Sequence, residues 1–416
     1  MTSRIGLPAA LLLLSACVST ATAPSSPSGS PAAATTEPLA TAATSPAATA
    51  SPALAGQVTA FEVLTELVGW VGLREGPAAT LAKTTDGGRT WRRVGTTPVG
   101  GITSLDELRF VDERRGFALA FNEQATPRKG SVLGTDDGGV TWTERLVVGA
   151  PAGMPGPSPL RDLVAVDDRH AWVVITTGPC DPAGCVTELR ATVDAGVTWS
   201  TSYRPSGAVV GTAAFSDISR GWLTESLAVR NGQDLLATSD GGRSWQTSLA
   251  VDKLRPSEAF VGVSGPTPRD VWALSFDTAS CTSDGCERYA LRASHDGGVT
   301  WTTTHPLDAN SAWWRKEGCG GFLGRPVFVD SAHGLIPMGQ GAGGLSPENP
   351  GGLLVTDDGG NSFRCVRVTP EKSSIEIRFA NAKVGWAIAF TIDNKRSGYR
   401  TADGGATWQQ LTLPGR

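Results

Sequence analysis

The chain has 416 residues, a formal net charge of −4 and no block of basic residues, which argues against a nucleic-acid partner. Its four histidines are scattered without the spacing of metal ligands, so neither a metal site nor another cofactor is predicted. Length alone would suggest two domains, but the internal repeats described below favour one large unit.

Residues 1–16 have the features of a secretion signal. One positive charge, Arg4, precedes an apolar run that is too short to span a bilayer, and the run ends in Leu14-Ser15-Ala16-Cys17. This ending resembles a bacterial lipobox, in which cleavage before Cys17 is followed by lipidation of the new terminal cysteine. We therefore expect an exported protein, anchored by lipid to the outer side of the bacterial cell membrane. An ordinary cleaved signal with a chance cysteine is the alternative.

Residues 17–56 consist almost wholly of Ala, Thr, Ser and Pro, and Glu37 is their only charge. Such a composition cannot bury enough apolar surface to offset the entropy of ordering, which predicts a disordered tether. As a coil it would span about 35 Å, enough to hold a folded domain away from a lipid surface.

From residue 57 to residue 414 the chain carries seven copies of the signature S/T-x-D-x-G-x-T/S followed by Trp or Phe. Successive signatures lie 45 to 62 residues apart, the span of one four-stranded blade. The aspartates of the seven signatures are Asp86, Asp137, Asp194, Asp240, Asp296, Asp358 and Asp403.

A second motif, a small residue before an aromatic or aliphatic one, stands upstream of each signature. Each unit therefore predicts an inner strand, a turn, a Gly-Trp strand, a variable loop, a short third strand, the Asp turn and an outer strand. Seven units predict an all-β fold, a seven-bladed β-propeller of four-stranded antiparallel blades. The second motifs are Gly69-Trp70, Gly116-Phe117, Ala171-Trp172, Gly221-Trp222, Val271-Trp272, Gly334-Leu335 and Gly385-Trp386.

The Asp signature is best explained as a turn. Its carboxylate can accept hydrogen bonds from the backbone of its own turn, and its glycines can take the left-handed conformation that a hairpin bulge needs. The following Trp should be buried at the start of the outer strand. The seven aspartates are therefore predicted to be structural and not a repeated carboxylate site.

The seven signatures resemble the Asp-box, or BNR, repeat of sialidases, sortilin-type receptors, some xyloglucan-cleaving glycosidases and the photosystem II assembly and stability factors. The combination with the upstream motif looks most like the last group and its bacterial relatives. Ala195 and Phe363 depart from the pattern, in place of Gly and Trp. The resemblance implies a chaperone-like partner surface with arginines among its features. Arg109 and Arg378 occupy matching inner-strand positions, where a structural salt bridge would explain them equally well.

Six cysteines remain besides Cys17, and disulfides are the default in an exported protein. Two short loops at equivalent places, Cys180 to Cys185 and Cys281 to Cys286, each favour a disulfide over a metal because no histidine lies near. Cys319 and Cys365 pair by subtraction, and a pair of free thiols is the alternative.

The long insertions all fall on the propeller face opposite the Asp turns, which is where scaffold folds often carry binding sites. Eleven of the 13 Trp belong to the two repeated motifs, and the two others lie in the insertion Trp313-Trp314-Arg315-Lys316. Aromatic and charged groups together suit a protein or carbohydrate contact. Packing under the loop, or against the top of the channel, is the alternative.

These features favour a non-enzymatic binding or assembly module, monomeric and tethered, with a protein or glycan partner. A sialidase-like or other glycoside hydrolase is the alternative function. The chain has only three tyrosines for a nucleophile, Tyr203, Tyr289 and Tyr399, and Arg325-Pro326 is a poor substitute for the early Arg-Ile-Pro of sialidases. A carboxylate pair across the channel stays open, because propeller sites are assembled from distant loops.

Overall fold

The structure is a computed structural model. It describes residues 54–96, 101–122, 124–151, 159–181, 184–206, 208–227, 234–250, 257–282, 285–286, 288–307, 322–339, 350–391 and 393–414. All of these belong to one compact unit, Ser51–Arg416. No helix in this part of the chain is long and apolar enough to cross a membrane. The predicted signal, Cys17, the tether and the Trp313-to-Lys316 insertion lie outside the described residues.

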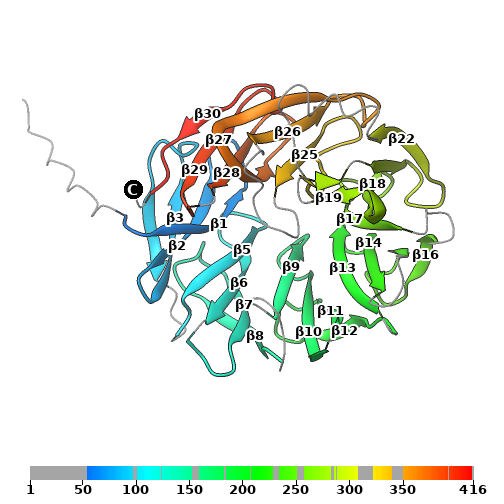
Figure 1. Ribbon diagram of the computed structural model, residues 1–416. Helices are drawn as coiled ribbons and strands as arrows, with labels where there is room; N and C mark the ends of the chain where they lie inside the picture. The colour runs from blue at the N-terminus through cyan, green and yellow to red at the C-terminus, as the bar shows by residue number, and fades with distance from the viewer. Residues whose placement is uncertain are drawn as a thin grey trace, which may run out of the picture. The chain divides into compact units, whose positions relative to one another are not determined.

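The unit is a seven-bladed β-propeller of four-stranded antiparallel blades, as the repeats predict (Figure 1). In this part of the chain the only helical turn is a 3-10 turn at Thr278–Ser280. The blades contain β1 Gln57–Val63, β2 Gly69–Glu75, β3 Ala78–Thr84 and β4 Arg92–Thr96; β5 Ser104–Phe110, β6 Gly116–Asn122, β7 Lys129–Thr135 and β8 Thr143–Gly149; β9 Leu160–Ala165, β10 Ala171–Asp181, β11 Gly184–Thr192 and β12 Ser200–Tyr203; β13 Ala208–Phe215, β14 Gly221–Leu227, β15 Leu235–Thr238 and β16 Gln246–Leu249; β17 Glu258–Ser264, β18 Val271–Asp277, β21 Tyr289–Ser294 and β22 Thr302–Leu307; β23 Phe322–Leu323 with β24 Val327–Phe328, β25 Gly334–Gly339, β26 Pro350–Thr356 and the first half of β27 Arg364–Phe379; and the second half of β27, β28 Gly385–Thr391, β29 Arg396–Thr401 and β30 Gln409–Leu411.

The first strand of each blade faces the centre, and β1, β5, β9, β13 and β17 follow one another around it (Figure 1). The sixth blade differs from the expected continuous inner strand. It has two short strands, β23 and β24, separated by Gly324, Arg325 and Pro326. Pro326 has no N–H to donate, and Gly324 instead donates its N–H to the Pro337 carbonyl at 2.7 Å. This break carries Arg325 into the channel.

In every blade the Asp turn is hydrogen-bonded to the turn that follows the inner strand. Gly87 donates to the Leu67 carbonyl at 2.8 Å in the first blade, and the corresponding residue does so in each of the other six. Both kinds of turn therefore lie on one face of the propeller. The loops between second and third strands must lie on the opposite face, which agrees with the sequence-based assignment of faces.

The Asp turns have the predicted hydrogen bonds. In the first, Asp86 accepts from the Thr90 N–H at 2.9 Å and from the hydroxyls of Thr90 and Thr84 at 2.6 and 2.7 Å. The same set of bonds recurs in the other six turns. The two residues after each Asp have positive φ, and in the third turn the first of them is Ala195, at φ 61°.

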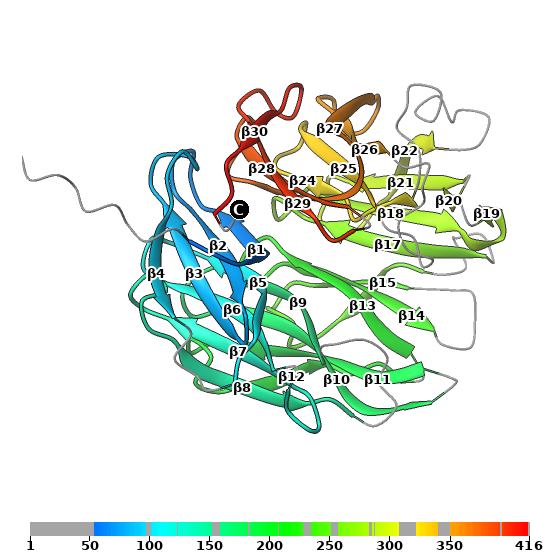
Figure 2. The same ribbon diagram turned by 60° about the vertical axis from the view of Figure 1, so that its left-hand side comes forward.

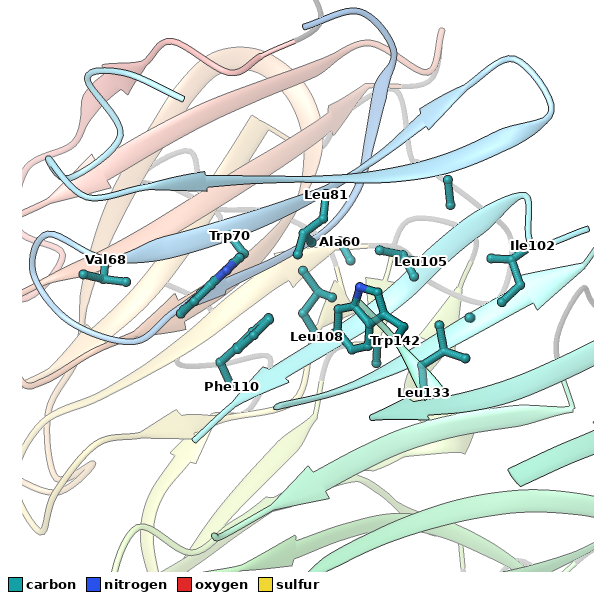
Figure 3. Close-up of a cluster of buried hydrophobic side chains, with 13 residues drawn as sticks. Ala60, Val68, Trp70, Leu81, Ile102, Leu105, Leu108, Phe110, Leu133 and Trp142 are labelled. Carbon is teal, nitrogen blue, oxygen red and sulfur yellow. The ribbon is translucent and has the colours of Figure 1, made fainter. Parts of the chain in front are cut away.

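The Gly-Trp strands supply the contacts between blades. Trp70 stacks on Phe110 of the next blade, with ring centroids 3.8 Å apart and planes 3° from parallel (Figure 3). Its indole Nε1–H donates to the Gly138 carbonyl, in the Asp turn of that same blade, at 3.1 Å. The Phe ring also explains the small residue of the motif, because a Cβ on Gly116 would lie 2.7 Å from Phe110.

We call the indole-to-carbonyl bond between two blades a clasp. Three more Trp residues make it, to the Asp turn of the following blade: Trp172 to Gly241 at 3.1 Å, Trp222 to Gly297 at 3.1 Å and Trp272 to Gly359 at 2.9 Å. All of these indoles are buried. Each clasp satisfies a donor that would otherwise be buried without a partner.

The Asp-box Trp residues are less buried than predicted. Only Trp142 is buried, and the other five are half-buried. Their indoles lie at the outer strands, near solvent, where Trp199, Trp301 and Trp408 donate to a Gly carbonyl of their own turn at 3.1 Å. The deeper positions belong to the Gly-Trp strands.

The ring closes without a shared strand. The first blade uses β1 to β4 and the last uses β27 to β30, so the two ends of the propeller meet through side-chain packing and a few hydrogen bonds and not through a common strand (Figure 2). Val58, Phe61 and Leu73 pack there against Trp386 and Leu411. The Trp91 indole donates to the Thr412 carbonyl at 2.8 Å. Trp386, however, makes no clasp, since its buried Nε1 has no hydrogen-bond partner.

Candidate functional site

The central channel gathers the charged residues of the inner strands. Side chains alternate across a strand, so residues two apart share a face. Leu108 and Ile377 are buried in the cores between blades. Their neighbours therefore face the channel, and these neighbours are Glu107, Arg109, Glu376 and Arg378. Glu107 and Glu376 stand at the middle of their inner strands, and Arg109 and Arg378 lie nearer the end that leads to the face with the Asp turns.

Arg109 is the centre of the network on the first two blades. Its guanidinium is 3.1 Å from the Glu107 carboxylate and 3.5 Å from that of Glu62, and it donates to the Leu108 carbonyl at 2.7 Å. Burial alone would lower the pKa of Arg109, but the carboxylates of Glu107 and Glu62 raise it overall. Burial raises the pKa of Glu62, against the opposing effect of Arg109.

Glu107 also connects the second blade to the third. Its carboxylate accepts hydrogen bonds from two consecutive backbone N–H groups, those of Asp162 at 2.9 Å and Leu163 at 3.2 Å. Asp162 has the left-handed φ of 58°, which is uncommon for a residue other than Gly. The left-handed conformation thus occurs at the point where the chain donates two consecutive N–H groups to the Glu107 carboxylate.

Arg325 reaches across the channel from the sixth blade. It donates from Nε to the Val263 carbonyl of the fifth blade at 3.0 Å and from Nη2 to the Ala213 carbonyl of the fourth at 2.5 Å. Its Nη1 pairs with the carboxylate of Asp162 in the third blade. One guanidinium therefore ties four blades together, which gives Arg325 a structural role in the ring.

The seventh blade stands apart from this network. Arg378 donates from Nη1 only to the carbonyl of its neighbour Ile377, at 2.9 Å, and its buried Nε has no hydrogen-bond partner. The guanidinium lies over the Phe61 ring, 5.7 Å from its centroid. No hydrogen bond or ion pair of Glu376 occurs among the described residues, although its side chain is open to solvent in the channel.

The channel environment perturbs both charges of the seventh blade. Burial, and after it the nearby charge of Arg109, lowers the pKa of Arg378. Desolvation by the surrounding walls raises the pKa of Glu376. The carboxylates of Glu62, Glu376 and Glu107 oppose the lowering of the Arg378 pKa, and the charges of Arg378 and Arg396 oppose the raising of the Glu376 pKa. Burial outweighs these charges in both residues.

The tyrosines do not form a sialidase-like nucleophile. Tyr203 does donate its hydroxyl to Glu225, but the pair lies on β12 and β14, away from the inner strands. Burial and the Glu225 carboxylate raise the pKa of Tyr203, the opposite of what an activated nucleophile needs. Tyr289 and Tyr399 are buried in the cores between blades, as strand residues, which agrees with the sequence reading.

The structure describes only some of the other predicted site residues. Cys281 and Cys286 form the predicted disulfide. Cys185 and Cys365 are also disulfide-bonded, but Cys319 and the side chain of Cys180 lie outside the described residues, so these two pairings stay predictions. Trp313, Trp314, Arg315 and Lys316 are outside them as well. Among the described residues, no group of three or more His, Cys, Asp or Glu could hold a metal ion.

Sequence reasoning noted Arg109 and Arg378 but missed the carboxylates beside them. The signal was present in the strand sequences Glu107-Leu-Arg-Phe and Glu376-Ile-Arg-Phe, where alternation places each Glu next to its Arg on the channel side. No comparable signal marks Asp162 as the partner of Arg325, because the two are far apart in sequence and on different blades.

Comparisons with known proteins agree on the fold. No family model and no curated protein matches the chain. Among solved structures, YCF48 from Cyanidioschyzon merolae is 13% identical with a TM-score of 0.50, over 86% of this chain and 96% of that one. YCF48 bound to D1 peptide is 17% identical with a TM-score of 0.51, over 85% and 95%. The BP39L lectin from Burkholderia pseudomallei is 9% identical with a TM-score of 0.54, over 86% and 99%.

Proposed function

We propose that the chain is an exported, lipid-anchored member of the Asp-box repeat family that acts as a non-enzymatic binding or assembly module. The observation that carries this proposal is the contrast within the channel. On blades one to six Arg109, Glu107 and Arg325 are bound to carboxylates or backbone groups of neighbouring blades, whereas on the seventh Arg378 hydrogen-bonds only the carbonyl of the adjacent Ile377 and Glu376 makes no hydrogen bond to the described residues. A channel lined by such charges, in which the described residues bring together no tyrosine nucleophile, suits binding better than catalysis.

The structural neighbours are consistent with this proposal at the level of the fold. Two are YCF48 structures, one of them bound to D1 peptide, and another is a lectin. A propeller of this kind can therefore serve as a binding scaffold, and a polypeptide partner is our first choice. The insertion with Trp313, Trp314, Arg315 and Lys316 remains the proposed second contact, on the opposite face.

Capture from native cell-envelope extract tests the proposal. Full-length protein with Arg378→Gln should recover at least tenfold less partner than the parent protein, since the substitution removes the positive charge from the seventh blade's part of the channel. Arg367→Gln, an exposed position on the outer half of the same strand, is the matched control and should recover the normal amount. The double variant Trp313→Ala/Trp314→Ala tests the second contact in the same assay. Equal recovery by the parent, Arg378→Gln and double variants would contradict the proposal.

One observation favours the alternative, a glycoside hydrolase. Glu376 is open to solvent in the channel and its pKa is raised by desolvation, the condition of a general acid. Turnover of fluorogenic glycosides that Glu376→Gln abolishes would establish the hydrolase. We expect no turnover by the parent protein.

A further inference from the structure

Two clefts lie on either side of the fourth blade, on the face that carries the Asp turns. The first cleft, of about 540 Å³, is bounded by β11 and β12 of the third blade and by the Asp turn of the fourth. The second cleft, of about 260 Å³, is bounded by β15 and β16 of the fourth blade and by the Asp turn of the fifth. Ser239, directly after β15, lines both clefts, so one extended ligand can occupy the two together.

The same hydrogen bond between blades lies in the wall of each cleft. In the first cleft the Ser202 hydroxyl donates to the Gly242 carbonyl at 2.7 Å. In the second cleft the Ser248 hydroxyl donates to the Gly298 carbonyl at 2.5 Å. The two clefts are therefore equivalent features of successive repeats, and the protein itself holds their walls in place.

Arg220, in the wall of the second cleft, is a charged residue without a protein partner. It precedes the Gly221-Trp222 motif, and its guanidinium lies against the next Asp turn, where a Cβ on Gly297 would be 3.4 Å from the Arg220 Cζ. Among the described residues, the Arg220 side chain makes no hydrogen bond or ion pair. The charged and histidine side chains at this position of four other blades are all paired: Arg115 with Asp112 and Asp168, His170 with Asp167, Asp270 with His295, and His333 with Asp330.

Arg243, in the wall of the first cleft, is a second such cation. It follows the two glycines of its Asp turn and is exposed. At the same place in other turns, Arg89 donates to the Asp86 carbonyl at 3.1 Å and Asn361 donates to the Asp358 carbonyl at 2.6 Å. The Arg243 side chain donates to no atom of the described residues. The fourth blade thus places one unpaired guanidinium in each cleft.

The other polar groups of the clefts are mostly exposed side chains whose hydrogen-bonding capacity is unused. None of the following makes a side-chain hydrogen bond to the described residues: Ser200 and Ser219 in the first cleft, Ser239 in both, and Gln246 and Thr247 in the second. Hydroxyls can donate and accept, so this lining suits a ligand that itself has many hydroxyls.

Exposed aliphatic side chains lie beside these polar groups. Val193 and Ile218 line the first cleft and are 53% and 51% exposed, and Val299 lines the second and is 76% exposed. A ligand that covers them must have apolar surface next to its polar groups, as the C–H faces of sugar rings have.

We propose that the two clefts bind an acidic oligosaccharide, a chain of uronic acids in chemical class. Its carboxylates pair with Arg220 and Arg243, its hydroxyls bond to the serine, threonine and glutamine side chains, and its ring faces cover the aliphatic groups. An acidic peptide would leave most of the side-chain hydroxyls without partners, and a neutral sugar would leave both guanidinium groups unpaired. The inference goes beyond the proposed function, because the site lies outside the channel and uses none of its residues.

Titration calorimetry of the full-length protein with ligands of equal length tests this site. The probe is hexagalacturonate, in which every sugar carries one carboxylate. Maltohexaose supplies sugar hydroxyls without charge, and hexaglutamate supplies carboxylates without sugar hydroxyls. We expect the probe to bind at least about tenfold more tightly than either comparison ligand, because only the probe satisfies both the guanidinium groups and the hydroxyls.

Variants locate the binding. Arg220→Gln and Arg243→Gln should each weaken binding of the probe at least about fivefold, since each removes one charge-assisted hydrogen-bond donor. Arg89→Gln removes the same charge at the equivalent place of the first blade, and this matched control should leave binding unchanged. The ligand series on the parent protein keeps the test decisive even where a variant folds poorly.

Three results would overturn the inference. The first is a parent protein that does not bind hexagalacturonate at millimolar concentration. The second is hexaglutamate or maltohexaose binding as tightly as the probe, which would indicate a plain anion site or a site without charge selection. The third is a loss of binding in Arg89→Gln as large as in Arg220→Gln and Arg243→Gln, which would place the ligand elsewhere.

Discussion

Ala195 occupies a backbone position that the other six Asp turns give to glycine. Its φ of 61° brings the Cβ of an L-residue close to its own carbonyl. The third turn nevertheless has the full set of hydrogen bonds, including those from Thr198 to Asp194 at 2.8 and 2.7 Å. The bonds of the turn therefore hold the alanine in an unfavourable conformation.

Ala195→Gly should stabilise the protein. Relief of the left-handed strain outweighs the greater freedom that glycine has in the unfolded chain, and a net gain of about 0.5–1 kcal/mol is expected. Urea unfolding measures it as a shift of the midpoint. Gly138→Ala, at the equivalent place in the second turn, is the reciprocal control and should destabilise. A neutral or destabilising Ala195→Gly would mean that the turn is not strained.

The Asp turns also predict how stability depends on pH. Burial acts to raise the pKa of Asp86, but hydrogen bonds from Thr90 and Thr84 outweigh it and lower the pKa to about 2. The pKa is lowered from the ordinary 3.8 in all seven turns. A carboxyl with a lowered folded-state pKa contributes stability that is complete above its unfolded value and is lost as the pH falls through the folded value.

The free energy of unfolding should therefore fall steeply between about pH 4 and pH 2. Urea unfolding at a series of pH values measures the slope. Replacing two of the aspartates, as in Asp86→Asn/Asp240→Asn, should lower stability at pH 7 and flatten the acid slope. An unchanged slope in this variant would show that other carboxyl groups cause the acid unfolding.

At the scale of the elements, the Gly-Trp strand joins each blade to the next. Four of the indoles make the clasp to the following Asp turn, while Phe117 and Leu335 have no N–H to donate. Trp386 has one and does not use it. The seam between the seventh and first blades thus has the indole but lacks the hydrogen bond.

Paired substitutions measure the clasp. Trp222→Phe removes the bond to the Gly297 carbonyl and leaves that acceptor buried, so it should cost about 1 kcal/mol more than Trp386→Phe, which removes no hydrogen bond. Both replace a fully buried indole with the same smaller ring, which cancels much of the packing loss. Chemical unfolding of the two variants gives the difference. Equal losses would indicate that the clasp contributes nothing.

Sequence reasoning works well for these elements because their causes are local. The Asp turn, its glycines and the small residue before each Trp lie within a few residues of one another, so their pattern predicts the blade. The broken inner strand of the sixth blade is an exception that Pro326 could have indicated. The degree of burial of the two kinds of Trp depended on neighbouring blades, and there the prediction for the Asp-box Trp residues was wrong.

At the scale of the whole molecule, the ring has a polar network on one side and a seam on the other. Contacts through Arg109, Glu107 and Arg325 link blades one to six across the channel. The seventh blade meets the first through apolar packing and isolated hydrogen bonds such as that from Trp91 to Thr412, with no shared strand and no clasp. Glu376 and Arg378 lie on the inner strand at this same seam.

These contacts could not be predicted from the sequence. Arg325 and Asp162 are separated by 163 residues and meet only because the blades close into a ring. The two Glu-x-Arg-Phe copies share one pattern in the sequence, yet Arg109 forms ion pairs with Glu107 and Glu62 while Arg378 hydrogen-bonds only the Ile377 carbonyl. The candidate site is thus a property of the ring and not of one repeat.

Hydrogen–deuterium exchange of the inner strands tests the central claim most directly, by comparing the seam with the junction between the first two blades. The account predicts faster exchange in Ser373–Phe379 and Gln57–Val63, the inner strands at the seam, than in Ser104–Phe110. A seam that exchanges no faster than the other junction would contradict it.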